Sequence, residues 1–168
     1  MLRLVDVPPP ASTRNLWDLP AVLLQKLPGN RFLATTKLIV TFRNEGDRAG
    51  LVLLGKNYGS LAVTKTRQGN VLRELICLGA DRGVSERVAA EVPISQDTVY
   101  LRATTDEGTI SFSFSLDGKE FHPIGESLAA KPGVWVGSKL GIYATGNSKS
   151  GEFGYADFDW FRFARFPQ

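Results

Sequence analysis

The sequence has a single cysteine, a single histidine and a single methionine, and the first two shortages exclude whole classes of site. Cys77 alone forms neither an internal disulfide nor a cysteine-based zinc cluster. It lies in the apolar stretch "LRELICLGA", which favours a buried small side chain over a nucleophile. His122 alone excludes a multi-histidine metal site. Thiol and histidine-metal chemistry is therefore not expected.

Catalytic motifs are also lacking. No G-x-S-x-G surrounds a serine, and neither a P-loop nor a dinucleotide-binding glycine pattern occurs. Glycoside hydrolysis needs only two suitably separated carboxylates. The acidic residues available for it stand mostly in predicted turns, where such side chains usually cap the backbone or face water: Asp18, Asp47, Glu74, Asp81, Asp106, Glu126 and Asp157.

The sequence also lacks a strong excess of acidic or basic residues, and it lacks long apolar runs. The 20 basic and 17 acidic residues are interspersed and give a net charge of +3, so we expect no nucleic-acid partner and no membrane partner. No run resembles a signal peptide or a membrane span. The chain as given is predicted to be cytoplasmic, while the compartment of any longer parent protein stays open.

What the sequence does contain is a succession of short apolar runs separated by turn residues, among them many of its 17 Gly and 9 Pro. This spacing is typical of an antiparallel β-sandwich, here a single domain over residues 1–168. Strands are predicted at 2–5, 32–42, 49–55, 60–67, 71–79, 98–106, 109–116, 139–146 and 154–166, and residues 21–27 are compatible with another.

The stretch "SFSFSLDGKEFHPIG" at 111–125 predicts a hairpin, because Asp117-Gly118 suits a two-residue type I′ turn. Phe114 then falls opposite Phe121 on the core face, and Ser113 falls opposite His122 on the other. The outer face, lined by serines and His122, is expected to be solvated, or to form the floor of a groove if its sheet is the concave one.

Four aromatic residues next to polar groups suggest a sugar site: Trp17, Tyr58, Trp135 and Tyr143. Tyr58 is predicted in a glycine-bounded turn and Trp135 in the loop "KPGVWVGS". A pyranose stacks its apolar face on a ring while its hydroxyls meet amides and charged groups. Candidate hydrogen-bonding partners are Gln25, Lys56 and Asn57. The alternative for each ring is packing over the edge of the core.

The order of the segments resembles a known family. "NLWDLPAVLLQKLP", "ATTKLIVTF", "AGLVLLGKNYGSLAVTK", "SQDTVYLRATTDEGTISFSFSLDGKEFHPIG", "GVWVGSKLGIYATG" and "GYADFDWFRF" together are similar to the C-terminal domain of glycoside hydrolase family 43 β-xylosidases, from about Leu2 to Phe163. The resemblance implies a concanavalin A-like β-sandwich, also classed as carbohydrate-binding module family 91, with xylan as the polysaccharide. Catalysis in such enzymes belongs to a separate propeller, whose active-site mouth an aromatic residue of the sandwich reaches. Trp135 matches that position.

The chain departs from the family pattern at its N-terminus, and the resemblance also suggests a metal site. Family domains usually begin upstream of "LRL", so either the sandwich lacks an outer N-terminal strand or the chain was cut there, and an exposed edge would favour a homo-oligomer. No cofactor is required, although some such sandwiches bind structural calcium. Asp157 and Asp159 are possible ligands, but two carboxylates are too few for a complete shell.

Three functions follow, in this order. The first is a noncatalytic carbohydrate-binding domain for xylan or xylo-oligosaccharides. The second is a docking domain that completes the active-site mouth of a family 43 catalytic propeller. The third is a self-contained glycosidase acting on xylan-derived substrates, which requires two carboxylates across a cleft.

Overall fold

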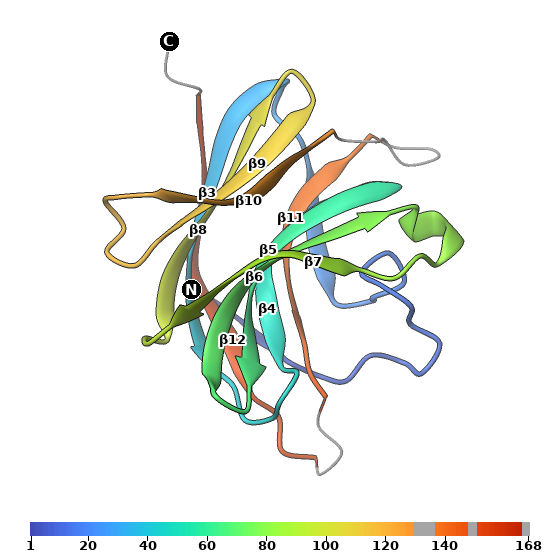
Figure 1. Ribbon diagram of the computed structural model, residues 1–168, viewed down its shortest axis with the longest axis vertical. Coiled ribbons are helices and arrows are strands. Elements are labelled where there is room, and N and C mark those ends of the chain that lie inside the picture. Colours follow the sequence, from blue (N-terminus) through green and yellow to red (C-terminus); the bar gives the residue numbers. More distant parts are fainter. Residues whose placement is uncertain (130–136, 148–150, 166–168) are drawn as a thin grey trace.

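A computed structural model describes residues 1–129, 137–147 and 151–165, and these residues form two antiparallel six-stranded sheets (Figure 1). Sheet A has the order β1-β12-β3-β8-β9-β10, and sheet B has the order β2-β11-β4-β5-β6-β7. The sheets are stacked face to face, so the predicted all-β sandwich is confirmed. Its one described helical element is the short 3-10 helix η1 at Ala80–Arg82.

Most strands of sheet A follow the predicted runs, and β3 and β12 are the longest with 11 residues each. Their bounds are β1 Leu2–Val5, β3 Arg31–Thr41, β8 Thr98–Asp106, β9 Thr109–Ser115, β10 His122–Ala129 and β12 Tyr155–Arg165. The strand β1 lies at one edge of this sheet and pairs with β12, while β10 lies at the other edge.

Sheet B includes two strands at its edges that the sequence marked weakly or not at all. The bounds are β2 Val22–Lys26, β4 Arg48–Leu54, β5 Asn57–Thr66, β6 Gly69–Leu78, β7 Arg87–Ile94 and β11 Lys139–Thr145. The edge strand β7 carries alternating residues but few large ones, which is why its sequence gave no strand signal.

The main core lies between the sheets. Side chains alternate along each strand, so Leu51 and Leu61 point inward from sheet B, and Leu38, Leu101 and Phe112 point inward from sheet A; all five are buried. Burial of a large apolar side chain contributes about 1.5–3 kcal/mol. Burial of the inward-facing side chains therefore contributes most of the free energy that holds the two sheets together.

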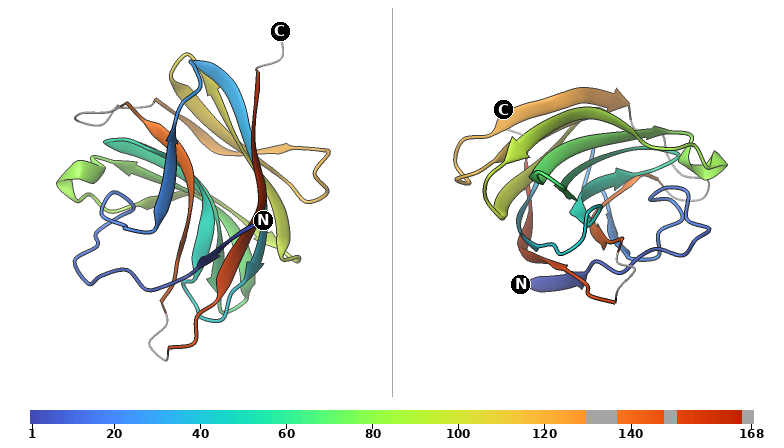
Figure 2. Two further views of the ribbon diagram at one scale, coloured as in Figure 1. Left: turned by 180° about the vertical axis from the view of Figure 1, so that it is seen from behind. Right: turned by 60° about the horizontal axis from the view of Figure 1, so that its bottom comes forward.

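A second apolar cluster lies on the outer face of sheet B. Leu16 and Leu19, from the segment between β1 and β2, cover Val52, Tyr58 and Tyr143 there. Figure 2 shows this blue segment looping beside sheet B before it enters β2. The outer face of sheet B is therefore partly closed by the chain itself.

The hairpin register predicted for residues 111–125 is wrong by one residue. His122 pairs with Phe114 and Pro123 with Ser113. The loop is wider than two residues because the Asp117 carboxylate accepts the backbone N–H of Lys119 (2.8 Å) and of Glu120 (3.0 Å). These bonds hold the pKa of Asp117 down at about 2.

The wider loop changes which side chains reach the core. Phe121 precedes β10 and is only partly buried, with the guanidinium of Arg102 above its ring at 3.4 Å. Leu116 is exposed, whereas Ser115, one of the serines predicted to line the outer face, is fully buried. Ser111 and Ser113 stay on the partly exposed outer face, as predicted.

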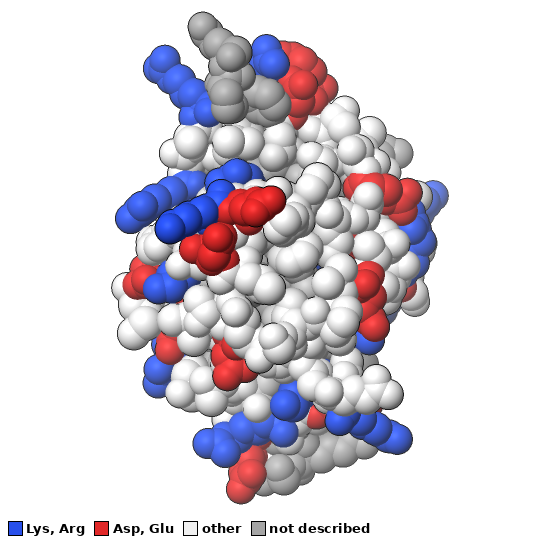
Figure 3. All heavy atoms as spheres, turned by 60° about the vertical axis from the view of Figure 1, so that its left-hand side comes forward, with Lys and Arg blue, Asp and Glu red and all other residues white. Residues whose placement is uncertain are grey.

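The surface and the buried thiol agree with the composition. Basic and acidic side chains are interspersed on the face drawn in Figure 3. Cys77 is free and fully buried, and burial raises the pKa of its thiol. Within the described ranges, no helix has the length and apolar character that crossing a membrane requires.

Candidate functional site

Tyr58 is a buried structural residue and not a surface ring. It lies inside β5 rather than in a turn, and its side chain is fully buried. Its hydroxyl accepts the backbone N–H of Leu16 (3.0 Å) and donates to Glu86 Oε1 (2.7 Å). Burial raises the pKa of Tyr58 well above its ordinary value. The expectation that its ring stacks on a sugar is therefore wrong, because Leu16 and its neighbours cover it.

Tyr143 is equally inaccessible. It lies in β11, is fully buried, and shares a hydrogen bond of 2.8 Å with the Ser60 hydroxyl. The guanidinium carbon of Arg48 stands 5.5 Å from the centre of its ring. Tyr143 and Tyr58 do come together with Trp17 in one cluster, but this cluster is a small outer core. Trp17 remains half-buried at its margin.

The remaining predicted residues are dispersed. Lys56 and Asn57 line a small pocket of about 220 Å³ beside η1, where the Lys56 ammonium lies 3.8 Å from an Asp81 carboxylate oxygen. Gln25 is exposed on β2 and lines a different, apolar groove. Trp135 lies outside the described residues. The structure thus does not gather the described candidates into a single sugar site.

A larger pocket lies on the outer face of sheet B next to the covered tyrosines. Its volume is about 410 Å³, within the usual range for small-molecule sites. Strands β4, β5, β6 and β11 form the floor, and the N-terminal segment forms a wall. The described residues around it are Pro9, Thr13, Arg14, Asn15, Leu16, Leu19, Gly46, Arg48, Thr64, Arg73, Leu75, Glu86, Thr145, Gly146 and Asn147; we call it the sheet B pocket.

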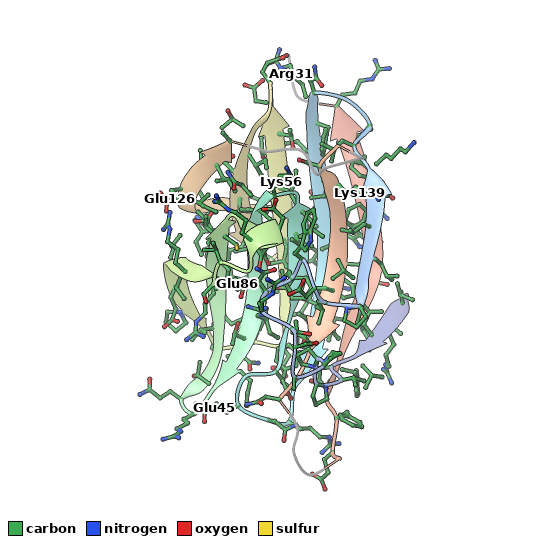
Figure 4. The ribbon with its side chains drawn as sticks, turned by 90° about the vertical axis from the view of Figure 1, so that its right-hand side faces the viewer. Arg31, Glu45, Lys56, Glu86, Glu126 and Lys139 are labelled. Carbon is green, nitrogen blue, oxygen red and sulfur yellow. The ribbon has the colours of Figure 1, made fainter. Side chains whose placement is uncertain are left out.

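Glu86 and Arg48 form the charged centre of the sheet B pocket. Arg48 Nη1 donates to Glu86 Oε2 at 2.7 Å, and both side chains are less than a fifth exposed. Burial by itself lowers the pKa of Arg48, but the adjacent Tyr143 and Glu86 side chains outweigh it and hold that pKa above its ordinary value. Figure 4 shows Glu86 midway along this face, between Lys56 and Glu45.

Two hydroxyl groups at the pocket lack a partner among the described residues. Thr64 of β5 and Thr145 of β11 are 5% and 8% exposed, and neither Oγ1 makes a hydrogen bond within that part of the chain. Unpartnered buried hydroxyls are costly, by about 1–3 kcal/mol each. Rotation about the Cα–Cβ bond exchanges the methyl and hydroxyl groups of threonine, which lets these oxygens face a molecule in the pocket.

Sequence reasoning missed all four of these residues. Glu86 stands in "GVSERV", which reads as a solvated turn, and Arg48 opens a strand after the polar stretch "NEGDR". The available signal was alternation, since Arg48 and Thr64 lie on the opposite face from the core residues Ala49 and Val63. That alternation identifies an outer face but not what covers it.

The predicted calcium ligands do not fit the metal. Asp157 accepts two hydrogen bonds from Arg3, both of 2.7 Å, and Asp159 accepts one from Lys37 at 3.2 Å. Arg3 holds the pKa of Asp157 below its ordinary value. Among the described residues, no group of three or more His, Cys, Asp or Glu side chains is placed to hold an ion. These two carboxylates therefore form ion pairs with basic side chains of the protein.

Hydrolysis at the sheet B pocket also lacks a necessary group. Glu86 is the one carboxylate among the described pocket residues, and it is held by Arg48 and Tyr58. Acid and base catalysis of glycoside cleavage uses two carboxyl groups. This geometry can bind polar molecules, but it does not supply the catalytic pair.

Comparisons with known proteins agree with the fold. A β-xylosidase of Formosa agariphila is 24% identical over 153 residues, which are 90% of this chain and 24% of the relative. Among solved structures, a bifunctional GH43-CE protein of Bacteroides eggerthii is 24% identical with a TM-score of 0.84, over 99% of this chain and 21% of the other. A xylan β-1,4-xylosidase of Bacillus halodurans is 23% identical with a TM-score of 0.77, over 96% and 32%.

The chain thus spans about a quarter of the curated relative and between a fifth and a third of these solved structures. The family described as the β-xylosidase C-terminal concanavalin A-like domain matches residues 1–164, nearly the whole chain. The chain therefore belongs to the family of C-terminal concanavalin A-like domains of β-xylosidases.

Proposed function

We propose that this chain is a noncatalytic carbohydrate-binding domain of β-xylosidase type, and that the sheet B pocket binds xylan or xylo-oligosaccharides. The observation that carries the proposal is the pair of unpartnered hydroxyls of Thr64 and Thr145 at a pocket of about 410 Å³. The named relatives include a β-xylosidase and a xylan β-1,4-xylosidase, which favours xylan as the polysaccharide.

The chemistry of the pocket suits a neutral sugar chain. Arg48 and Arg73 offer N–H donors, and the Glu86 carboxylate offers acceptor oxygens. The apolar part of the pocket wall is formed by Leu16, Leu19 and Leu75, and the described lining includes no aromatic ring. Sugar hydroxyls both donate and accept, so a mixed wall of this kind can satisfy them, and the apolar surface covers the ring carbons.

Replacing both threonines by valine tests the proposal without harming the fold. Thr64→Val and Thr145→Val remove hydroxyls that make no hydrogen bond to any residue the structure describes, so stability should stay equal or rise. Binding of xylohexaose, measured by calorimetry, should weaken roughly 5- to 150-fold for the double variant, because each of the two lost hydrogen bonds is worth about 0.5–1.5 kcal/mol.

The matched control is Thr105→Val. Its Oγ1 is also buried and unpartnered, but Thr105 points into the core from β8 and not into the pocket. This variant should bind xylohexaose as the parent does. Unchanged affinity in the double variant would place the sugar elsewhere.

An apolar groove favours docking to a catalytic propeller as a second candidate function. It lies between the edges of the two sheets, has a volume of about 250 Å³, and is lined by Leu2, Leu23, Leu24, Gln25, Leu140, Gly141, Ile142 and Phe161. Leu2 and Leu23 are each nearly half exposed. Exposed leucines around an apolar groove are typical of protein contacts.

Leu23→Asp tests the docking function. Analytical gel filtration with the isolated propeller of a family 43 β-xylosidase should show co-elution of the parent domain and none of the variant, because a charge in the groove would have to be desolvated. Val88→Asp, at a similarly exposed valine of β7, is the control and should co-elute. Loss of co-elution in both variants, or in neither, would contradict this groove as the contact.

A further inference from the structure

The outer face of sheet A carries a second surface that the proposed function does not use. Tyr100 of β8, Lys37 of β3 and Trp160 of β12 stand side by side on three neighbouring strands. Two residues further along, Arg102 and Arg162 flank Thr35 in the same way. All of these face outward, because the alternate residues of β3 and β8, such as Leu38 and Leu101, lie in the core. We call this set the sheet A platform.

A β-bulge places Trp160 on the platform. The pairing of β12 with β3 shifts between Phe158 and Trp160, so that Phe158 stays in the core while Trp160 turns outward to face solvent beside Lys37. Its ring centre lies 6.1 Å from that of Tyr100, and both rings are partly exposed. Bulges commonly re-aim a side chain where a strand borders a functional site.

The two arginines of the platform have no carboxylate partner among the described residues. Arg102 donates to the Thr35 hydroxyl (3.0 Å) and lies over the ring of Phe121, and the exposed Arg162 lies over the ring of Trp160 at 4.5 Å. Burial without an acid beside it lowers the pKa of Arg102. Lys37, by contrast, is paired with Asp159. The platform therefore holds two guanidinium groups available to an external anion.

We infer that the sheet A platform binds polysaccharide chains that carry carboxylates, namely uronic-acid-substituted xylan. The inference rests on the proposed function for the choice of polysaccharide. Trp160 and Tyr100 offer apolar ring surface to the backbone sugars, and Arg102 and Arg162 offer forked N–H donors that match a carboxylate. Thr35 lies between the two arginines, and Ser113 follows Arg102 on the next strand, β9.

The test is calorimetry with glucuronoxylan and with the same polymer after reduction of its carboxyl groups. We expect the parent domain to bind the acidic polymer about tenfold more tightly, and the difference to shrink at higher salt because exposed charges are screened. Arg162→Gln, at an exposed position, should remove most of this difference, and Arg102→Gln/Arg162→Gln should remove it all. Thermal melting of each variant confirms that it is folded.

Arg67→Gln is the matched control. It removes one positive charge from the far hairpin of sheet B, where Arg67 is 86% exposed and paired with Glu45, and should leave the difference intact. Equal affinity of the parent for both polymers, or an equal loss in the control, would overturn the inference. Xylohexaose binding that survives these changes but fails in the threonine variants would separate this surface from the sheet B pocket.

Discussion

Replacing Tyr58 by alanine should lower the free energy of unfolding by about 3–5 kcal/mol, as expected for a fully buried aromatic side chain. The change leaves a cavity beneath Leu16, removes the partner of the Leu16 N–H, and leaves Glu86 with Arg48 alone of its two partners described above. Urea denaturation followed by tryptophan fluorescence measures the loss. Had Tyr58 been a surface ligand ring, the same change would weaken binding and leave stability intact.

Two companion variants sharpen this prediction. Tyr58→Phe keeps the ring and loses the hydroxyl, so it should cost about 1–3 kcal/mol for the unpartnered groups alone. Tyr100→Ala removes a tyrosine that is only partly buried and should cost clearly less than Tyr58→Ala. An equal loss for Tyr100 and Tyr58 would contradict the assignment of Tyr58 to a covered outer core.

Asp6 is a buried carboxyl whose charge the fold does not satisfy. The side chain has no exposed surface, and neither oxygen makes a hydrogen bond of ordinary geometry with a described residue. The neighbouring Asp47 is buried too, but its carboxylate accepts the backbone N–H groups of Arg43 (2.9 Å) and Asn44 (2.7 Å). Burial first, and the adjacent Asp47 second, raise the pKa of Asp6 from its ordinary 3.8 to about 7.

Asp6→Asn should therefore stabilise the domain at high pH and not at low pH. Because the pKa of Asp6 is raised in the folded state, the protonated carboxyl contributes to the free energy of unfolding. This contribution is fully present below about pH 4 and is lost as the pH rises through about 7. Asparagine stays neutral throughout. We expect about 2 kcal/mol in favour of the variant near pH 8, which is half the full linkage value because a buried site relaxes when its carboxyl is charged.

Urea denaturation at about pH 4, 6 and 8 measures this divergence, since it reports the free energy of unfolding of both proteins under each condition. Asp47→Asn is the contrasting variant, because it weakens bonds that organise the loop after β3, and it should destabilise at every pH. A constant difference between Asp6→Asn and the parent across the pH range would show that Asp6 does not titrate in the folded state.

Alternation along the strands made the architecture predictable. Leu51 with Leu53, and Leu101 with Ala103, face the core as their spacing indicates, and the order of the segments pointed to the family that matches residues 1–164. The hairpin at 111–125 failed by one residue because the Asp117 side chain competes for backbone N–H groups. The spacing of apolar residues does not reveal that a side chain will compete for backbone N–H groups.

The site was less predictable, because segments far away in the sequence decide whether the outer face of a sheet is covered or exposed. Tyr58 and Tyr143 do point away from the main core, but the segment that carries Leu16 folds back over them. Strict alternation also places Phe158 and Trp160 on one face, whereas the bulge separates them. Covering segments and bulges are decided by tertiary packing, which a single sequence does not display.

We propose that this domain binds xylan chains in the sheet B pocket. The decisive experiment is calorimetric titration of the parent domain and of Thr64→Val/Thr145→Val with xylohexaose, with cellohexaose as the control sugar. We predict saturable heat with xylohexaose, a clear loss of affinity in the double variant, and no heat with cellohexaose. Absence of saturable heat from the parent at high protein concentration would contradict the claim and leave docking to a propeller as the function to test.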